Sequence, residues 1–231
     1  MQLTAIYGFM TNLIAQAQET STLSYLQTQF EKGGTFMWFI LAALVIGLAF
    51  SFERMWTLSR ASINTKKFIV EVKEALTNGG VEEAMKVCEN SRGSIASVFH
   101  AGLLRADEGI EAAEKAIMAY GAIEMGFLEK GLIWISTMIT IAPMLGFTGT
   151  VQGMIQAFDA IAEAAQISPG IVASGISVAL LTTLFGLIVA MILQVFYNYF
   201  VSRIDKIVAD MEESSIELID ALYELQQKKQ Q

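Results

Sequence analysis

The chain has 231 residues, of which 54% are hydrophobic and only 16% are charged, and its mean hydropathy is +0.49. Soluble domains typically carry about 25% charged residues, so this composition excludes an ordinary soluble enzyme. The net charge of −8 argues against nucleic acid as a partner, because nucleic-acid-binding surfaces are basic. The single cysteine, Cys88, excludes an intramolecular disulfide scaffold. An integral membrane protein remains.

The predicted fold class is all-α. The sequence holds only two prolines and is rich in Ala, Leu, Ile and Met, which favours helices throughout. It lacks the many alternating segments of about ten residues that a transmembrane β-barrel needs. We therefore expect three transmembrane helices that extend into a cytoplasmic helical bundle.

Residues 1–32 form a predicted N-terminal segment on the periplasmic side or at the membrane interface. Its first 18 residues contain a modest apolar stretch, which predicts an amphipathic helix at the membrane surface. A cleaved signal peptide is the alternative, because Ala15-Gln16-Ala17 resembles a cleavage site. Signal peptides normally begin with a positively charged region, however, and this segment has none.

Three long uncharged runs follow in chain order. The predicted transmembrane helices are residues 33–52, 131–158 and 171–202. Each run reaches the roughly 20 residues of helix that cross a hydrocarbon core of about 30 Å. The third begins after Ser168-Pro169-Gly170, and proline is tolerated at a helix start because its missing N–H has no intrahelical partner there.

The distribution of Lys and Arg predicts the orientation in the membrane, since basic residues gather on the cytoplasmic side. Residues 53–130 contain ten basic residues, whereas the loop 159–170 contains none. The consistent solution places the N-terminus and the loop 159–170 in the periplasm. Residues 53–130 and the C-terminal helix 203–231 then lie in the cytoplasm.

Helical patterning also marks the predicted cytoplasmic parts. An apolar stripe runs through residues 65–89 and is broken at Asn78-Gly79-Gly80. From Asp107 onward, helical patterning continues directly into the second span. A heptad-like stripe in the tail predicts that it packs on other helices and forms one helix with the third span. Its members are Ile204, Val208, Met211, Ser215, Leu218, Leu222 and Leu225.

No catalytic constellation occurs in the sequence. It has no nucleophile elbow, no glycine-rich phosphate loop and no metal-ligand spacing, so we expect neither enzymatic activity nor a metal or cofactor. Cys88 lies on an apolar helical face and is expected to pack there. His100 is expected to have a surface or capping role.

Small and polar residues recur at helical spacing in the second and third spans. Gly146, Thr150 and Gly153 share one face of the second span, and Gly149 with Gly153 forms a GxxxG motif. The third span repeats small residues every four positions. Those repeats are Gly175, Ala179 and Thr183, and Thr182, Gly186 and Ala190. Such spacing lets helix backbones approach closely in lipid.

Two interpretations of the threonines remain open. Threonine hydroxyls in membrane helices often bond only to a carbonyl of their own helix. Alternatively, Thr150 and Thr183 line a narrow and partly hydrated pathway. No titratable residue lies inside any predicted span, and the nearest acids, Asp159 and Glu163, sit at the outer edge. A titratable group at membrane depth, if the function needs one, must therefore come from another chain.

Two segments resemble a known family. Residues 141–158 (IAPMLGFTGTVQGMIQAF) and 175–191 (GISVALLTTLFGLIVAM) resemble the second- and third-span motifs of the MotA/TolQ/ExbB proton channel family. Glu53-Arg54, Glu124 and Glu129-Lys130 also fit its pattern. Three spans with an external N-terminus resemble the ExbB/TolQ branch most closely.

The resemblance implies a motor subunit in the bacterial inner membrane, driven by the proton gradient. It implies a homopentamer around a single-span partner of the ExbD or TolR type that supplies a membrane aspartate, and transfer of work to a TonB- or TolA-like protein at the outer membrane. By the same resemblance, Thr150 and Thr183 line the ion pathway. The helix-packing residues are Pro143, Gly146, Gly149, Gly153, Gly175, Thr182 and Gly186.

One departure and two alternatives qualify this assignment. Relatives of the ExbB type often carry a glutamate where this chain has Val178. The first alternative is a stator for gliding, secretion or flagellar rotation, driven by protons or sodium. The second is a passive membrane scaffold that conducts no ions.

Overall fold

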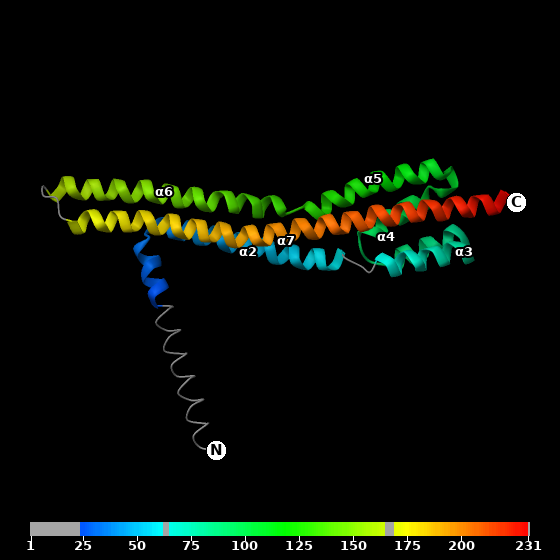
Figure 1. Cartoon of the computed structure of the whole chain (residues 1–231), viewed down its shortest axis with the longest axis horizontal. Coiled ribbons are helices and arrows are strands. Elements are labelled where there is room, and N and C mark those ends of the chain that lie inside the picture. Colours follow the sequence, from blue (N-terminus) through cyan, green and yellow to red (C-terminus); the bar gives the residue numbers. More distant parts are fainter. Residues whose placement is uncertain (1–23, 62–64, 165–168, 231) are drawn as a thin grey trace, which may run out of the picture. The chain divides into compact units, whose positions relative to one another are not determined.

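The computed structural model describes residues 24–61, 65–164 and 169–230. Within these ranges the chain forms helices and turns and contains no strand (Figure 1). The predicted all-α class is therefore confirmed. The amphipathic helix and the cleavage site expected for residues 1–18 lie outside the described residues.

The helices follow one another along the chain with short connections. A helical segment over residues 24–32 precedes the first labelled element. The labelled elements are α2 (Thr35–Ala61), α3 (Thr65–Asn90), α4 (Ser94–Leu104), the 3₁₀ helix η1 (Ala106–Glu108), α5 (Ile110–Glu129), α6 (Leu132–Ala164) and α7 (Pro169–Gln230).

Among the described residues, three helices are long and apolar enough to cross a membrane, and each overlaps one of the predicted spans. These are α2, α6 and α7. Helix α6 continues beyond the predicted end of the second span at residue 158 and reaches Ala164. Helix α7 runs without interruption for 62 residues, so the third span and the tail form one helix as expected.

The prediction of a continuous helix from Asp107 into the second span is wrong. The helix starts only at Ile110 and ends at Glu129, where Lys130 turns out of helical geometry with ψ 127°. Gly131 then has a φ of 94°, a left-handed conformation that glycine adopts at no steric cost. Apolar periodicity continues across this junction, so the pattern alone did not reveal the break.

The chain divides into two compact units. In the first, residues up to 47 and residues 137–194 contribute parts of α2, α6 and α7. Gly47 of α2 lies against the fully buried Leu193 of α7. Large apolar side chains such as Trp38, Phe147 and Leu180 are 65–68% exposed, which leaves wide apolar surfaces for lipid or other helices.

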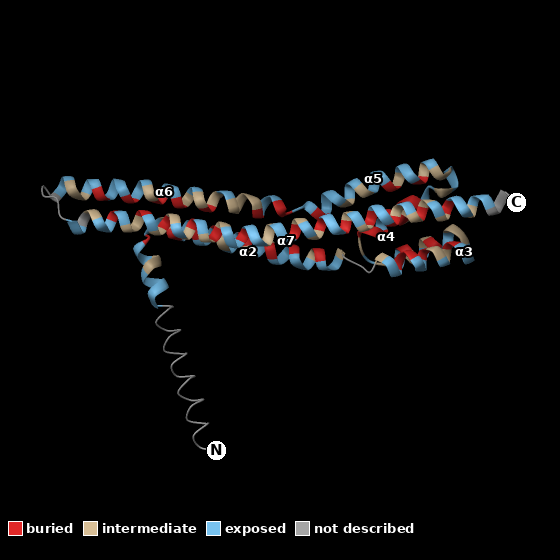
Figure 2. Ribbon diagram, in the orientation of Figure 1, coloured by how far each residue is buried: buried red, intermediate tan, exposed pale blue. Residues whose placement is uncertain are grey.

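The second unit contains residues 48–136 and 195–231 and has a hydrophobic core of its own (Figure 2). The core is built by α3, α4, α5 and the distal part of α7. Phe68 and Phe99 pack ring to ring at 5.6 Å, and Leu218 contributes from the tail stripe. The predicted interruption of the helix at residues 78–80 is confirmed by Gly80, which has a φ of 75° inside α3.

Candidate functional site

Helices α6 and α7 meet backbone to backbone along their small residues in the first unit. A Cβ atom added to Gly146 would lie 2.9 Å from the carbonyl oxygen of Thr182, and one added to Gly186 would lie 2.6 Å from that of Ala142. Both distances are shorter than any tolerated contact. Glycine is therefore required at these positions for the helices to come this close.

The same crossing continues toward the connection between the two helices. A Cβ atom on Gly153 would lie 2.9 Å from the carbonyl oxygen of Gly175, and the methyl of Ala157 fills the space beside Gly175. Gly149 faces the side chain of Thr182. The antiparallel register thus brings together all five glycines that the sequence assigned to packing: Gly146, Gly149, Gly153, Gly175 and Gly186.

Thr182 is completely buried in this contact. Its hydroxyl donates to carbonyl oxygens of its own helix, at 3.1 Å to Val178 and 2.9 Å to Ala179. Val178 therefore offers a backbone acceptor to a packing threonine. Pro143 lies inside α6, where its ring removes one helix hydrogen bond without ending the helix.

The two candidate pathway threonines behave differently. The hydroxyl of Thr150 donates to the Phe147 carbonyl of its own helix at 2.6 Å. The hydroxyl of Thr183 reaches across to the Gly146 carbonyl of α6 at 3.4 Å. Both side chains are half-buried, so each retains surface outside the α6–α7 contact. Among the described hydrogen bonds, none joins the two threonines.

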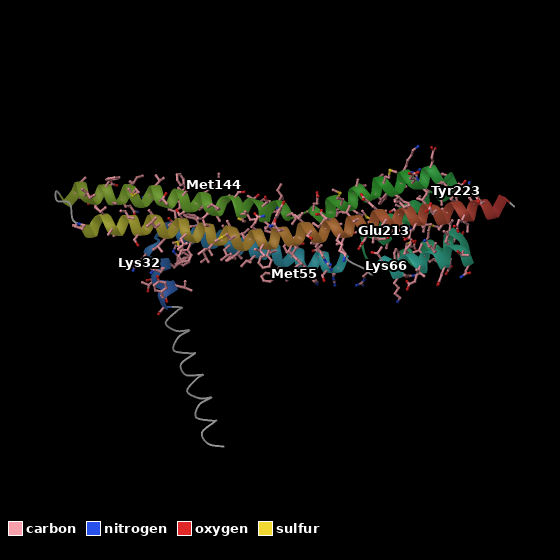
Figure 3. The ribbon with its side chains drawn as sticks, in the orientation of Figure 1. Lys32, Met55, Lys66, Met144, Glu213 and Tyr223 are labelled. Atoms are coloured by element: carbon pink, nitrogen blue, oxygen red, sulfur yellow. The ribbon has the colours of Figure 1, made fainter. Side chains whose placement is uncertain are left out.

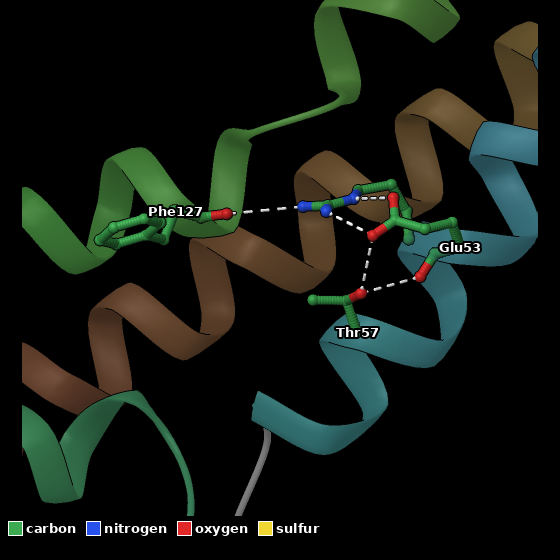
Figure 4. Close-up of polar contacts among 4 residues, drawn as sticks. Glu53, Thr57 and Phe127 are labelled. Carbon is green, nitrogen blue, oxygen red and sulfur yellow. Dashed lines mark hydrogen bonds and ion pairs between the residues drawn. The ribbon is translucent and has the colours of Figure 1, made fainter.

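A charged junction in the second unit was not singled out as a site by the sequence. Arg54 of α2 is 6% exposed and forms a bidentate ion pair with Glu53, at 2.8 and 2.7 Å (Figure 4). Its third bond, at 3.4 Å, goes to the Phe127 carbonyl in the last turn of α5. Terminal helix carbonyls lack intrahelical partners, so Arg54 caps α5 where the chain turns into α6.

The electrostatics of this junction favour charged Glu53. The hydrogen bonds from Arg54 hold the pKa of the Glu53 carboxyl below its usual value, and a 3.0 Å bond from Thr57 adds to the effect. The adjacent charges in the sequence signalled this pair. The burial of Arg54 could not be predicted from the sequence, because it depends on Gly131, which lies about 75 residues further along the chain.

The remaining singled-out residues take structural places. Cys88 is buried in the second unit's core, as expected, and burial raises the pKa of its thiol to about 12. His100 is about one-third exposed, and its Nε2 lies 3.3 Å from a Glu89 carboxylate oxygen. Among the described residues, no cluster of His, Cys, Asp or Glu could hold a metal ion.

Comparison with known proteins identifies the family to which these helices belong. The sequence profile described as "MotA/TolQ/ExbB proton channel family" matches residues 90–213, more than half of the chain. The chain belongs to this family. The resemblance inferred from the span motifs is thereby confirmed. The family is of the channel and transport type.

Individual relatives point to the same branch. An ExbB homologue from Methanothermobacter thermautotrophicus, named for biopolymer transport, is 33% identical over 177 residues, covering 76% of this chain and 63% of the relative. ExbB of Salmonella typhimurium is 34% identical over 91 residues, 39% of this chain and 36% of the relative. TolQ of Haemophilus influenzae is 34% identical over 87 residues, 38% of each chain. The matched segments thus span less than two thirds of each relative's length.

Proposed function

We propose that this chain is the multi-span subunit of an ExbB/TolQ-type motor in the bacterial inner membrane, with its N-terminus in the periplasm. It uses the proton gradient together with a single-span partner of the ExbD or TolR type and energises a TonB- or TolA-like protein. The observation that carries this proposal is the pairing of acid-free spans with two half-buried threonine hydroxyls beside a backbone-to-backbone helix crossing.

The threonines have the chemistry for such a pathway. A hydroxyl both donates and accepts hydrogen bonds, so it can relay between water and a carboxylate without being ionised. Thr183 already bridges α6 and α7, and its bond of 3.4 Å to Gly146 is long enough to exchange for a better partner. The carboxylate must come from the partner, because the spans of this chain contain none.

Assembly into a homo-oligomer, which we propose to be a pentamer, is supported by the surface of the second unit. An apolar groove of about 630 Å³ lies between α5 and α7. Met118 and Ile216, which line it, are 63% and 65% exposed, and Phe127 nearby is 57% exposed. Apolar surface of this extent in a segment outside the spans favours contact with further protein chains.

Ion flux through the complex tests the pathway. The chain and a single-span partner of the ExbD or TolR type would be reconstituted in liposomes, and Thr183→Val would be compared with Thr183→Ser. We expect valine to lower proton flux about two- to tenfold, the equivalent of one hydrogen bond of roughly 0.5–1.5 kcal/mol, and serine to preserve it. Thr148→Val is the matched control, because Thr148 is exposed on α6 and bonds only to Met144 of its own helix.

Each outcome separates the candidate functions. Unchanged flux in Thr183→Val at equal expression overturns the lining role of Thr183. Flux that follows sodium instead of protons identifies a sodium-driven stator. Absence of flux with every single-span partner identifies a passive scaffold. Native mass spectrometry of the same complex counts the copies and tests the pentamer.

A further inference from the structure

We propose that a cavity between α3 and α7 binds the phosphate headgroup of an anionic phospholipid. The cavity belongs to the second unit and has a volume of about 450 Å³. Three cationic side chains line it: Lys66 from the first turn of α3, and Arg203 and Lys206 from α7. Glu213 of α7 also lines the cavity, and Figure 3 labels it together with Lys66.

The three cations have no anionic partner in the described part of the chain. None of them lies within 4 Å of a carboxylate oxygen there, although other basic residues of the same unit do. Glu217, which also lines the cavity, is already paired with Lys73. Three unpaired cations around one cavity favour an anion, and phosphate offers the acceptor oxygens that Lys and Arg bind.

The cavity lies at the expected level of the membrane surface. Arg203 is the first charged residue after 39 uncharged ones, so it marks the end of the third span. Lys206 follows about 4.5 Å further along the helix. The headgroup layer is about 5–8 Å thick on each side of the hydrocarbon core, so both side chains fall within it. Basic pockets at this depth on the cytoplasmic side suit anionic lipid headgroups.

The acidic lining residues lie beyond this level. Asp210 and Glu213 follow Arg203 by about 10 and 15 Å along α7. Lys73 of α3 contacts Glu217 of α7. Lys66 lies seven residues before Lys73 on α3, and Asp210 lies seven residues before Glu217 on α7. Lys66 is therefore level with Asp210, and its flexible side chain must reach back toward Arg203 to join the anion site. Asp210 then limits the affinity by repulsion.

Lipid binding by the full-length chain tests the proposal. The delipidated protein in neutral detergent would be titrated with phosphatidylglycerol and with phosphatidylcholine of the same acyl chains, and adducts would be counted by native mass spectrometry. Replacing Lys66, Arg203 and Lys206 by Gln should lower the preference for phosphatidylglycerol about tenfold or more. Replacing Lys86, Arg105 and Lys115 by Gln removes the same charge elsewhere in the unit and should leave the preference intact.

Two further measurements keep the result decisive. Asp210→Asn, which leaves all three cations in place, should strengthen phosphatidylglycerol binding, and its failure to do so contradicts the assigned site. Inorganic phosphate should compete only weakly, and competition equal to that of the lipid would identify a soluble anion and overturn the lipid assignment. An equal loss of preference in both triple variants would also overturn it, as a net-charge effect.

This proposal uses the membrane boundary at residue 202 but neither a partner nor ion flux. The assay contains only the chain and lipid. A negative result in this lipid-binding assay would therefore not contradict the proposed motor function. Loss of flux in the threonine variants would likewise not contradict the proposed lipid site. Circular dichroism of each variant checks that the helices are retained.

Discussion

The guanidinium of Arg54 fills the space into which a Cβ atom of residue 131 would project. A Cβ atom on Gly131 would lie 3.0 Å from Nε and 3.4 Å from Cζ of Arg54. The glycine's positive φ turns α5 into α6 at this point, and the arginine binds the last turn of α5 through the Phe127 carbonyl. A buried cation and a glycine distant in sequence thus define one junction together.

Substitution of Gly131 by alanine tests the junction. We expect the free energy of unfolding to fall by about 1–3 kcal/mol, because alanine is strained at this φ and its methyl meets Arg54. Gly126→Ala is the matched control, since Gly126 lies within α5 with open space around it and alanine is the better helix former. Thermal unfolding followed by circular dichroism measures both. Equal stability of the two variants would contradict the account of the junction.

Replacement of Arg54 by methionine tests the cap. It leaves the terminal carbonyl of α5 without its donor and removes the buried cation, so we expect a loss of about 1–3 kcal/mol. Arg105→Met is the control, because Arg105 is 56% exposed and its pair with Glu108 contributes little. A cost for Arg54→Met no larger than for the control would show that the cap is energetically silent.

The Arg54–Glu53 pair also predicts a pH dependence. The pKa of Glu53 is lowered in the folded chain, so its charged form stabilises the fold above the unfolded value near 4.5. This contribution is lost as the pH falls through the lower folded value. Solvent screening at the half-exposed carboxylate keeps it below about 1 kcal/mol. The stability difference between wild type and Arg54→Met should therefore narrow in acid, and a difference independent of pH would contradict the pairing.

The contact between α6 and α7 predicts a sharp size limit. Gly153→Val should destabilise the first unit by about 1–3 kcal/mol, because the added carbons meet the backbone of Gly175. Ala173→Val is the control, because Ala173 is exposed on α7, and it should lower the free energy of unfolding by less than about 0.5 kcal/mol. Unfolding in detergent, followed by circular dichroism, measures both changes. Tolerance of valine at residue 153 would mean that the helices do not approach closely in solution.

Cys88 provides a probe of the second unit's core. With a pKa of about 12, roughly one in ten thousand of its thiols is ionised at pH 8, so alkylation of the folded chain should be very slow. Unfolding restores an ordinary pKa near 9 and rapid reaction. The sign of the linkage follows: the fold loses stability as the pH rises from 9 toward 12, because the unfolded thiol ionises first. Fast alkylation under native conditions would contradict the burial of Cys88. The Cys88→Ala variant is the control for labelling of groups other than this thiol.

The sequence by itself predicted the membrane character of this protein and the three helices that are long and apolar enough to cross a membrane. Long uncharged, apolar runs are stable in the hydrocarbon core of a bilayer, and small residues at four-residue spacing indicate one face of a helix. The glycines assigned to packing on this basis do lie in the α6–α7 contact. These features are local and periodic, so they can be predicted from a single amino-acid sequence.

Only the tertiary structure decided which groups meet across the chain. The break at Gly131 is invisible in the periodicity because apolar positions continue on both sides of it, and its cause is a conformation that glycine permits. The burial of Arg54 depends on α5 and Gly131, far away in the sequence. Likewise, Thr150 bonds to its own helix whereas Thr183 reaches α6. Hydrogen-bond partners depend on packing and register between helices, and single-helix patterns contain no information about either.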